Sequence, residues 1–212
     1  MTLPKVDLII IGVGGNSLEV HERIKKENPD WSIRFLDDAS NHPLVIGGLR
    51  QTAETHDSKK LFMIGSPKNF RSREELFLGL EIPIGEMSTY LDKNSWISDT
   101  ASIGLGSVLM WNSYVGNSSL LGKYLMILPN VFIGHDTTIG DYTVIAANVA
   151  ISGGVTIGKQ CYIGANATIR EGIIIGENAL IGAGSVVITN VPSNSTFVGN
   201  PARNLPAQKH FK

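Results

Sequence analysis

The chain has 212 residues and a formal net charge of −1 at pH 7, so it carries no excess of basic residues for non-specific binding of nucleic acid. No apolar stretch approaches the ~18 residues of a membrane-spanning helix, and the single cysteine fits a reducing compartment. We therefore expect a cytoplasmic protein, with neither nucleic acid nor membrane insertion in its function.

Charge and glycine are distributed unevenly along the chain. Residues 1–90 hold 24 of the 37 charged side chains, whereas residues 91–212 hold 13 of them together with 15 of the 23 glycines. β-Branched residues are frequent in the second half, which distinguishes it from a disordered segment. The chain is expected to divide into an α/β domain at residues 1–88, a repeat domain at 89–192 and an exit segment at 193–212.

The first domain begins with an apolar run at residues 8–11, of the type found in buried strands, followed by a glycine-rich turn at residues 12–17. A helix is expected over residues 18–24, a second strand over 32–36 and a third over 61–64. This order is typical of a small parallel, Rossmann-like α/β unit with a ligand crevice at the carboxyl ends of its strands.

The glycine-rich turn contains Gly12, Gly14, Gly15 and Asn16, but it lacks the third glycine of the dinucleotide fingerprint. These glycines could serve only a tight turn. Two acidic residues, Asp37-Asp38, follow about 25 residues later, near the place of a ribose-binding acid. Because the domain is too short for a full dinucleotide fold, the pattern favours a nucleotide or a nucleotide sugar over NAD.

The second domain follows a six-residue repeat. Every sixth residue from position 91 to position 187 is aliphatic, which makes 17 aliphatic residues in 17 positions, and the next residue is glycine in nine of them. A helix would spread such residues around its surface, whereas a short strand followed by a tight turn points each of them inward. Stacked turns then bury a continuous aliphatic column, with neighbouring coils ~4.8 Å apart.

Hexads such as residues 139–144 (IGDYTV) and 157–162 (IGKQCY) resemble the signature of left-handed β-helix acyltransferases. The resemblance implies a left-handed parallel β-helix with three hexads per coil, hence between five and six coils, and a homotrimer. The segment 198–203 (VGNPAR) is similar to the usual exit of that family from its β-helix.

Together with the first domain, the chain resembles the nucleotide-sugar and sialic-acid acyltransferases. The matching segments are residues 12–15, 35–38 and 64–65. The resemblance implies that the first domain binds a nucleotide-linked sugar, and that the substrate-binding residues are Gly12, Gly14, Gly15, Asn16, Asp37, Asp38 and Gly65.

His135 is the one histidine of the repeat domain, and it occupies an outward position of its hexad beside Asp136. An exposed surface histidine is the ordinary interpretation of such a residue. Acyl transfer, however, needs a base for the proton of the acceptor, and Gly134-His135-Asp136 matches the catalytic motif of the family. By resemblance, His135 is the general base for direct attack on the thioester, and Asp136 orients or polarises its ring.

Acetyl-CoA is the co-substrate that the resemblance implies, lying in a groove between two prisms of the trimer. Matching positions in the family are Val144, Gly153, Ala165 and Ala183, although each of these could instead serve only a tight corner. Near the exit, Arg203 and Lys209 could meet the phosphates of the coenzyme.

These features suggest four candidate functions. The first is N-acetylation of a nucleotide-linked 4-amino-4,6-dideoxysugar for bacterial surface glycans. O-acetylation of a sialic-acid-type sugar and a non-catalytic nucleotide-sugar-binding β-helix are alternatives. A metal-dependent lyase similar to γ-type carbonic anhydrase needs about three histidine ligands, and the repeat domain has one, so no metal is expected.

Overall fold

The computed structural model describes residues 6–55 and 57–205, and it divides the chain into two compact units. The first unit comprises Met1–Ile64 and Glu74–Thr89, and the second comprises Gly65–Arg73 and Tyr90–Lys212. The first unit is thus discontinuous. The division expected between residues 88 and 89 did not anticipate that residues 65–73 pack with the second unit.

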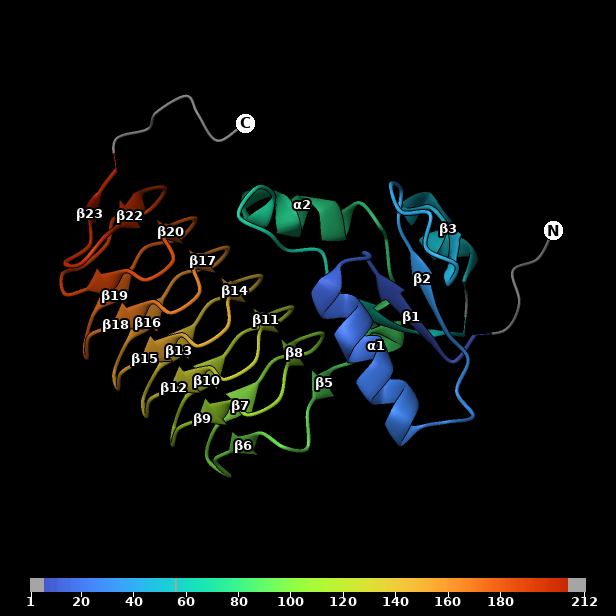
Figure 1. Cartoon of the computed structure of the whole chain (residues 1–212), viewed down its shortest axis with the longest axis horizontal. Helices are drawn as coiled ribbons and strands as arrows, with labels where there is room; N and C mark the ends of the chain where they lie inside the picture. The colour runs from blue at the N-terminus through green and yellow to red at the C-terminus, as the bar shows by residue number, and fades with distance from the viewer. Residues whose placement is uncertain (1–5, 56, 206–212) are drawn as a thin grey trace. The chain divides into compact units, whose positions relative to one another are not determined.

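The first unit contains a parallel sheet in the order β3-β2-β1-β4 (Figure 1). Its strands are β1 (Leu8–Ile11), β2 (Ile33–Leu36), β3 (Val45–Gly47) and β4 (Lys59–Phe62). The helices along the chain are α1 (Gly15–Glu27), η1 (Leu49–Glu54), η2 (Phe70–Ser72), α2 (Arg73–Leu78) and η3 (Ile84–Glu86). The strand β3 was not predicted, because it is only three residues long and half-buried.

The helix α1 begins within the glycine-rich turn, at Gly15, and buries one apolar face, which includes Val20 and Ile24. It is longer at both ends than the predicted span of residues 18–24. Among the helices that the structure describes, none is long and apolar enough to cross a bilayer.

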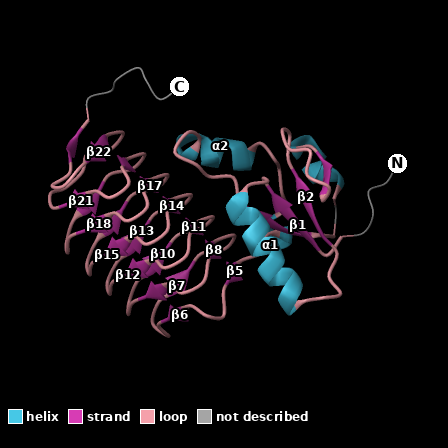
Figure 2. Ribbon diagram, viewed as in Figure 1, coloured by secondary structure: helices cyan, strands magenta, loops and turns pink. Residues whose placement is uncertain are grey.

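The second unit is a parallel β-helix of about six coils, built of very short strands joined by turns (Figure 2). Its strands are β5 (Tyr90–Leu91), β6 (Trp96–Ile97), β7 (Ser102–Ile103), β8 (Val108–Leu109), β9 (Tyr114–Val115), β10 (Leu120–Leu121), β11 (Met126–Ile127), β12 (Phe132–Ile133), β13 (Thr138–Ile139), β14 (Val144–Ile145), β15 (Ala150–Ile151), β16 (Thr156–Ile157), β17 (Tyr162–Ile163), β18 (Thr168–Ile169), β19 (Ile174–Ile175), β20 (Leu180–Ile181), β21 (Val186–Val187), β22 (Thr196–Val198) and β23 (Arg203–Asn204).

From β5 to β18, each strand of the β-helix pairs in parallel with the strand 18 residues further along the chain, whereas β22 pairs antiparallel with β23. Ile127, for example, lies beside Ile145, and Ile145 lies beside Ile163. Three sheets result, in the orders β19-β16-β13-β10-β7, β23-β22-β20-β17-β14-β11-β8-β5 and β21-β18-β15-β12-β9-β6. The aliphatic residues of the repeat fill the space between the sheets, and from Leu109 onward they are buried.

A second six-residue series runs through the turns of the β-helix. Every sixth residue from Gly106 to Gly184 has a positive φ, including Asn130, Asp136 and Asn148. Glycine, asparagine and aspartate tolerate this left-handed conformation better than other residues do. The turns therefore explain the asparagines of the repeat and glycines such as Gly106 and Gly184, and they give Asp136 a backbone conformation that an extended strand would not allow.

Residues 65–73 pack on one sheet of the β-helix. Arg73 donates a 2.9 Å hydrogen bond from Nη1 to the carbonyl oxygen of Tyr142, and Gln160 donates one of 2.7 Å to the carbonyl oxygen of Arg71. Arg71 in turn donates from Nε to the carbonyl oxygen of Asn178. Tyr142, Gln160 and Asn178 are left-handed turn residues of successive coils. The segment therefore binds along one corner of the β-helix.

Candidate active site

His135 and Asp136 lie at the corner between β12 and β13, and their side chains contact each other. The Nδ1 atom of His135 is 2.7 Å from the Oδ2 atom of Asp136, and the two side chains are 70% and 66% exposed. Neighbouring residues of an extended strand point to opposite sides. Here Asp136 has a φ of 55°, which turns its carboxylate back to the imidazole.

This contact determines how the imidazole can act. A proton on Nδ1 is held by the carboxylate of Asp136, so the lone pair of the neutral ring lies on Nε2. The carboxylate also stabilises the imidazolium that forms when Nε2 accepts a proton. The pair therefore has the composition and the geometry of a general base with its orienting group.

Gly153 lies on the same corner, one coil further. A Cβ atom at this position would be 2.6 Å from Nε2, 2.7 Å from Cε1 and 3.0 Å from Cδ2 of His135. The imidazole therefore packs against the Cα atom of Gly153. Within the part of the chain that the structure describes, the N–H of Gly153 donates no hydrogen bond, although its carbonyl accepts one from Gly172.

The other three residues expected at the coenzyme lie elsewhere on the β-helix. Ala165 and Ala183 are stacked in successive coils at the corner that precedes β18 and β21, where the N–H of Gly184 binds the carbonyl oxygen of Ala165. The side chain of Val144 is buried, and a Cβ atom on Gly65 would lie 3.0 Å from its Cγ2. A single chain brings Gly153 to His135 but does not bring the two alanines to it.

The predicted substrate residues of the first unit fall into two groups. Gly12 has a φ of +96°, and a Cβ atom there would be 2.5 Å from the Cγ1 atom of Ile64, so the fold itself requires this glycine. A Cβ atom at Gly14 or Gly15 would meet nothing within 4 Å. The chain leaves open space at these two exposed glycines, next to the half-buried Asn16.

Asp37 holds the glycine turn to the end of β2. Its Oδ2 atom accepts a hydrogen bond from the N–H of Val13, and its Oδ1 atom accepts from the N–H groups of Ala39 and Ser40, each at 2.8 Å. Asp38 accepts from the N–H of Leu49 through Oδ1. Asp37 therefore orders the backbone of the glycine turn, whereas Asp38 orders the backbone at the start of η1.

The remaining predicted residues are separate from these groups. Gly65 belongs to the second unit, whereas the other expected substrate residues belong to the first. Arg203 is exposed in β23 and donates to the carbonyl oxygen of Ala202. Lys209 lies outside the described residues.

Cys161 has a packing role. It is fully buried, and its Sγ atom lies 3.2 Å from the carbonyl oxygen of Gly176. Thr143 makes the equivalent contact one coil earlier, from Oγ1 to the carbonyl oxygen of Gly158. Burial raises the pKa of the thiol to about 11. No group of three or more histidine, cysteine, aspartate or glutamate residues suited to a metal occurs within residues 6–55 and 57–205.

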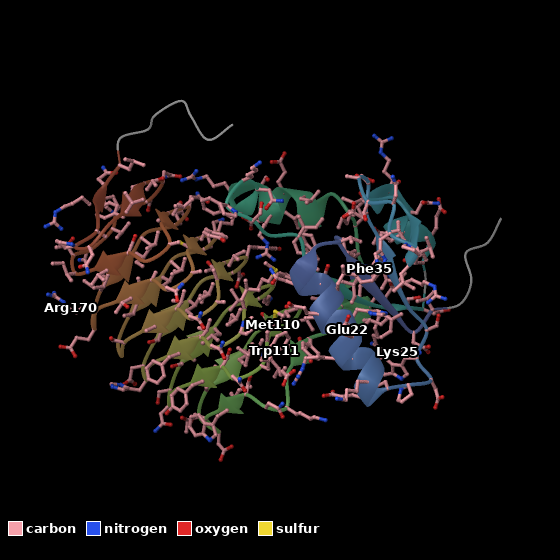
Figure 3. All side chains as sticks on the ribbon, in the orientation of Figure 1. Glu22, Lys25, Phe35, Met110, Trp111 and Arg170 are labelled. Carbon is pink, nitrogen blue, oxygen red and sulfur yellow. The ribbon has the colours of Figure 1, made fainter. Side chains whose placement is uncertain are left out.

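One exposed cation on the corner of His135 was not singled out in the sequence. Arg170 lies two coils beyond Gly134, and its side chain projects away from the β-helix (Figure 3). Successive coils pair residues 18 apart, so counting 36 residues onward from Gly134 would have found it.

A pocket of about 370 Å³ in the first unit is lined by other residues, among them His21, Lys25, Trp31 and Arg34. Burial is the main reason that the pKa of His21 is lowered. The ammonium of Lys25 is engaged by the carbonyl oxygen of Trp31 at 2.8 Å. None of the predicted site residues lines this pocket.

Comparison with known proteins shows that the sequence repeat is similar to one found in transferases. Residues 118–153 and 154–189 each match the family model "Bacterial transferase hexapeptide (six repeats)". Among curated proteins, none matches the chain by sequence.

Several solved structures share the fold over nearly their whole length. The acetyltransferase domain of PglB from Neisseria gonorrhoeae FA1090 has a TM-score of 0.83 at 26% identity, covering 93% of this chain and 98% of that chain. WeeI from Acinetobacter baumannii AYE has a TM-score of 0.79 at 29% identity, with coverages of 93% and 99%. PerB from Caulobacter crescentus, in complex with CoA and GDP-perosamine, has a TM-score of 0.81 at 23% identity, with coverages of 93% and 96%.

The PglB domain has also been solved in complex with acetyl coenzyme A, with a TM-score of 0.82 to this chain. The expected resemblance is confirmed: the repeat is that of bacterial hexapeptide transferases, and the left-handed β-helix is that of sugar N-acetyltransferases. Over residues 118–189 the chain matches the repeat of bacterial hexapeptide transferases, and its fold is similar to that of the PglB acetyltransferase domain, which is consistent with an acyltransferase.

Proposed function

We propose that this protein transfers the acetyl group of acetyl-CoA to the amine of a nucleotide-linked 4-amino-4,6-dideoxysugar. The observation that carries the proposal is the 2.7 Å contact between His135 and Asp136, exposed on a β-helix that has no other histidine. The similarity to the PglB domain, which was solved with acetyl coenzyme A, supports the choice of acyl donor. The similarity in fold to PerB, which was solved with GDP-perosamine, supports a nucleotide-linked sugar as the acceptor.

In the proposed reaction, the Nε2 atom of His135 takes a proton as the acceptor amine attacks the carbonyl carbon of the thioester. A C–N bond forms, the C–S bond breaks, and the proton on His135 passes to the departing thiolate of CoA. Asp136 stabilises the imidazolium between these two transfers. The N–H of Gly153 is the donor that we assign to the oxyanion, because it lies on the same corner and donates no hydrogen bond in the described chain.

We also propose that the working form is a homotrimer. His135 and Gly153 lie at one corner of the β-helix, whereas Ala165 and Ala183 lie at another, with the sheet of β12, β15 and β18 between them. An acyl donor that touches both sets of residues is accommodated more readily between two copies of the chain than on a single copy. The outer face of that sheet carries three exposed, stacked rings, which a second copy would cover; these are Trp96, Tyr114 and Phe132.

For the sugar nucleotide, the proposed site is the glycine turn of the first unit. The open space at Gly14 and Gly15, at the amino terminus of α1, suits a phosphate, since N–H groups and the helix dipole favour negative charge there. Asp37 would support this turn through its bond to the N–H of Val13, and Asp38 would order the neighbouring backbone at Leu49. A cytoplasmic location remains a prediction, supported by the single cysteine.

The test is to measure release of free thiol from acetyl-CoA with a panel of acceptors. The panel contains UDP-, dTDP- and GDP-linked 4-amino sugars, their 4-hydroxy analogues and free sialic acid. The proposal predicts turnover with at least one amino sugar, and a loss of about 10²–10⁴-fold in His135→Ala without unfolding. Glu177→Ala, at the equivalent hexad position of another corner, is the matched control and should keep wild-type activity.

Turnover with sialic acid but with no amino sugar would favour the O-acetyltransferase alternative. Absence of any turnover, together with no binding of acetyl-CoA in calorimetry, would favour a non-catalytic module. Full activity of His135→Ala would remove this residue from the mechanism.

A further inference from the structure

We propose that Gly153 is a positioning residue for the catalytic imidazole, and that the missing side chain at this position sets where the Nε2 atom of His135 points. The inference deepens the proposed function and rests on it for the role of His135.

The backbone of the β-helix does not require glycine at position 153. The equivalent hexad position from residue 105 to residue 183 is occupied by glycine only here. Its other occupants are Leu105, Trp111, Asn117, Lys123, Pro129, His135, Asp141, Ala147, Lys159, Ala165, Glu171, Glu177 and Ala183. Gly153 has no positive φ, in contrast to its neighbour Gly154, whose φ is +67°.

The glycines that follow the aliphatic residue of a hexad are required for a different reason. A Cβ atom on Gly134 would be 2.6 Å from the backbone nitrogen of Gly153, and this kind of backbone collision recurs at Gly116 and Gly140. At Gly153, the three nearest atoms to an added Cβ all belong to the ring of His135. A side chain at this position would therefore have to displace the imidazole rather than the coil.

Two contacts consequently determine the orientation of the imidazole ring of His135. Asp136 holds Nδ1 on one edge, and Gly153 lies against the opposite edge, which carries Nε2. A methyl group at 153 would push that edge away from the coil, because 2.6 Å is far below a normal contact between nonbonded heavy atoms. The ring would then tilt, and either the bond to Asp136 or the direction of Nε2 would change.

The variant Gly153→Ala tests this positioning, since it adds only the methyl group and retains the backbone N–H. We expect the melting temperature to be nearly unchanged. We also expect kcat to fall about 10- to 100-fold, because an error of about 1 Å in the place of a reacting group can cost that much. KM for acetyl-CoA should change less than twofold. Gly134→Ala is the contrasting variant, and its melting temperature should fall.

The decisive readout is nuclear magnetic resonance of histidine labelled with ¹³C and ¹⁵N, in the protein without substrates. The His135 signals are assigned by their loss in His135→Ala. Positioning predicts that the ring signals of His135 shift in Gly153→Ala and that the tautomer populations change. Because this measurement needs no turnover, it stands even if no acceptor sugar is found and the proposed function fails.

A double variant tests whether the effect of Gly153→Ala on activity depends on His135. If Gly153 acts through His135, Gly153→Ala should have no further effect on activity when His135 is already alanine. Unchanged ring signals and unchanged kcat in Gly153→Ala would overturn the proposal. A raised KM for acetyl-CoA with unchanged ring signals would also overturn it, since Gly153 would then only provide space for the coenzyme.

Discussion

The Nδ1 atom of His135 lies 2.7 Å from the Oδ2 atom of Asp136, although the two residues are adjacent in the chain. The contact depends on the left-handed φ of 55° at Asp136, which belongs to the series of turn residues that recurs every six positions. The turn that shapes the coil thus also brings together the two residues that we propose as the base and its orienting group.

Asp136→Asn is expected to lower kcat/KM at least tenfold while leaving the fold intact. Asparagine occupies the same turn position at residues 130 and 148, so the left-handed conformation is retained. The loss arises because an amide carries no charge to stabilise the imidazolium. The thiol-release assay and a thermal melt check the two expectations.

Asp136→Ala is the companion variant. Alanine removes the carboxylate and also strains the left-handed turn by about 1 kcal/mol, so this variant should melt earlier than Asp136→Asn. Equal activity of wild type and Asp136→Asn would show that the carboxylate does not assist the base.

Gly12→Ala and Gly14→Ala should separate folding from ligand binding in the glycine turn. At Gly12, a methyl group meets Ile64 on a backbone with positive φ, so the first unit should be destabilised. At Gly14, the structure has open space, so the fold should tolerate alanine. If a phosphate approaches this backbone, Gly14→Ala should weaken binding of the sugar nucleotide about tenfold or more in calorimetry, with an unchanged melting temperature.

Tight sugar-nucleotide binding by Gly14→Ala would mean that the turn serves the fold alone. A melting temperature of Gly12→Ala equal to that of the wild type would contradict the steric argument.

The thiol of Cys161 should be unreactive in the folded protein. Burial raises its pKa to about 11 from an unperturbed 9.0, so at pH 8 about one thiol in a thousand is ionised. Titration with a thiol reagent at pH 8 should show slow reaction of the native protein and fast reaction after unfolding in guanidinium. Rapid labelling with parallel loss of activity would instead indicate a reactive cysteine.

The raised pKa of Cys161 also predicts how the stability of the fold changes with pH. Because the folded pKa lies above the unfolded one, the contribution of the protonated thiol is complete below pH 9 and is lost as the pH rises towards 11. Cys161→Thr reproduces the arrangement of Thr143 and should lack this part of the pH dependence, which denaturant titrations at pH 8 and pH 10.5 can measure.

The sequence by itself determined the repeat and the residue that stands out on it. Each hexad repeats one backbone conformation, so an inward aliphatic residue recurs every six positions and is visible without any structure. The same regularity made His135 conspicuous, since the repeat domain contains no other histidine. Local patterns also located three of the four strands of the first unit, whereas the edge strand β3 is too short to produce such a pattern.

Only the tertiary structure decided which residues meet across the coils. The six-residue period does not state how many hexads complete a coil, and so it does not pair His135 with Gly153 or separate Ala165 and Ala183 from them. The attachment of residues 65–73 to the β-helix and the use of Asp37 to hold the glycine turn depend likewise on contacts between distant segments. Such contacts follow from how the coils and strands stack, because no local period records them.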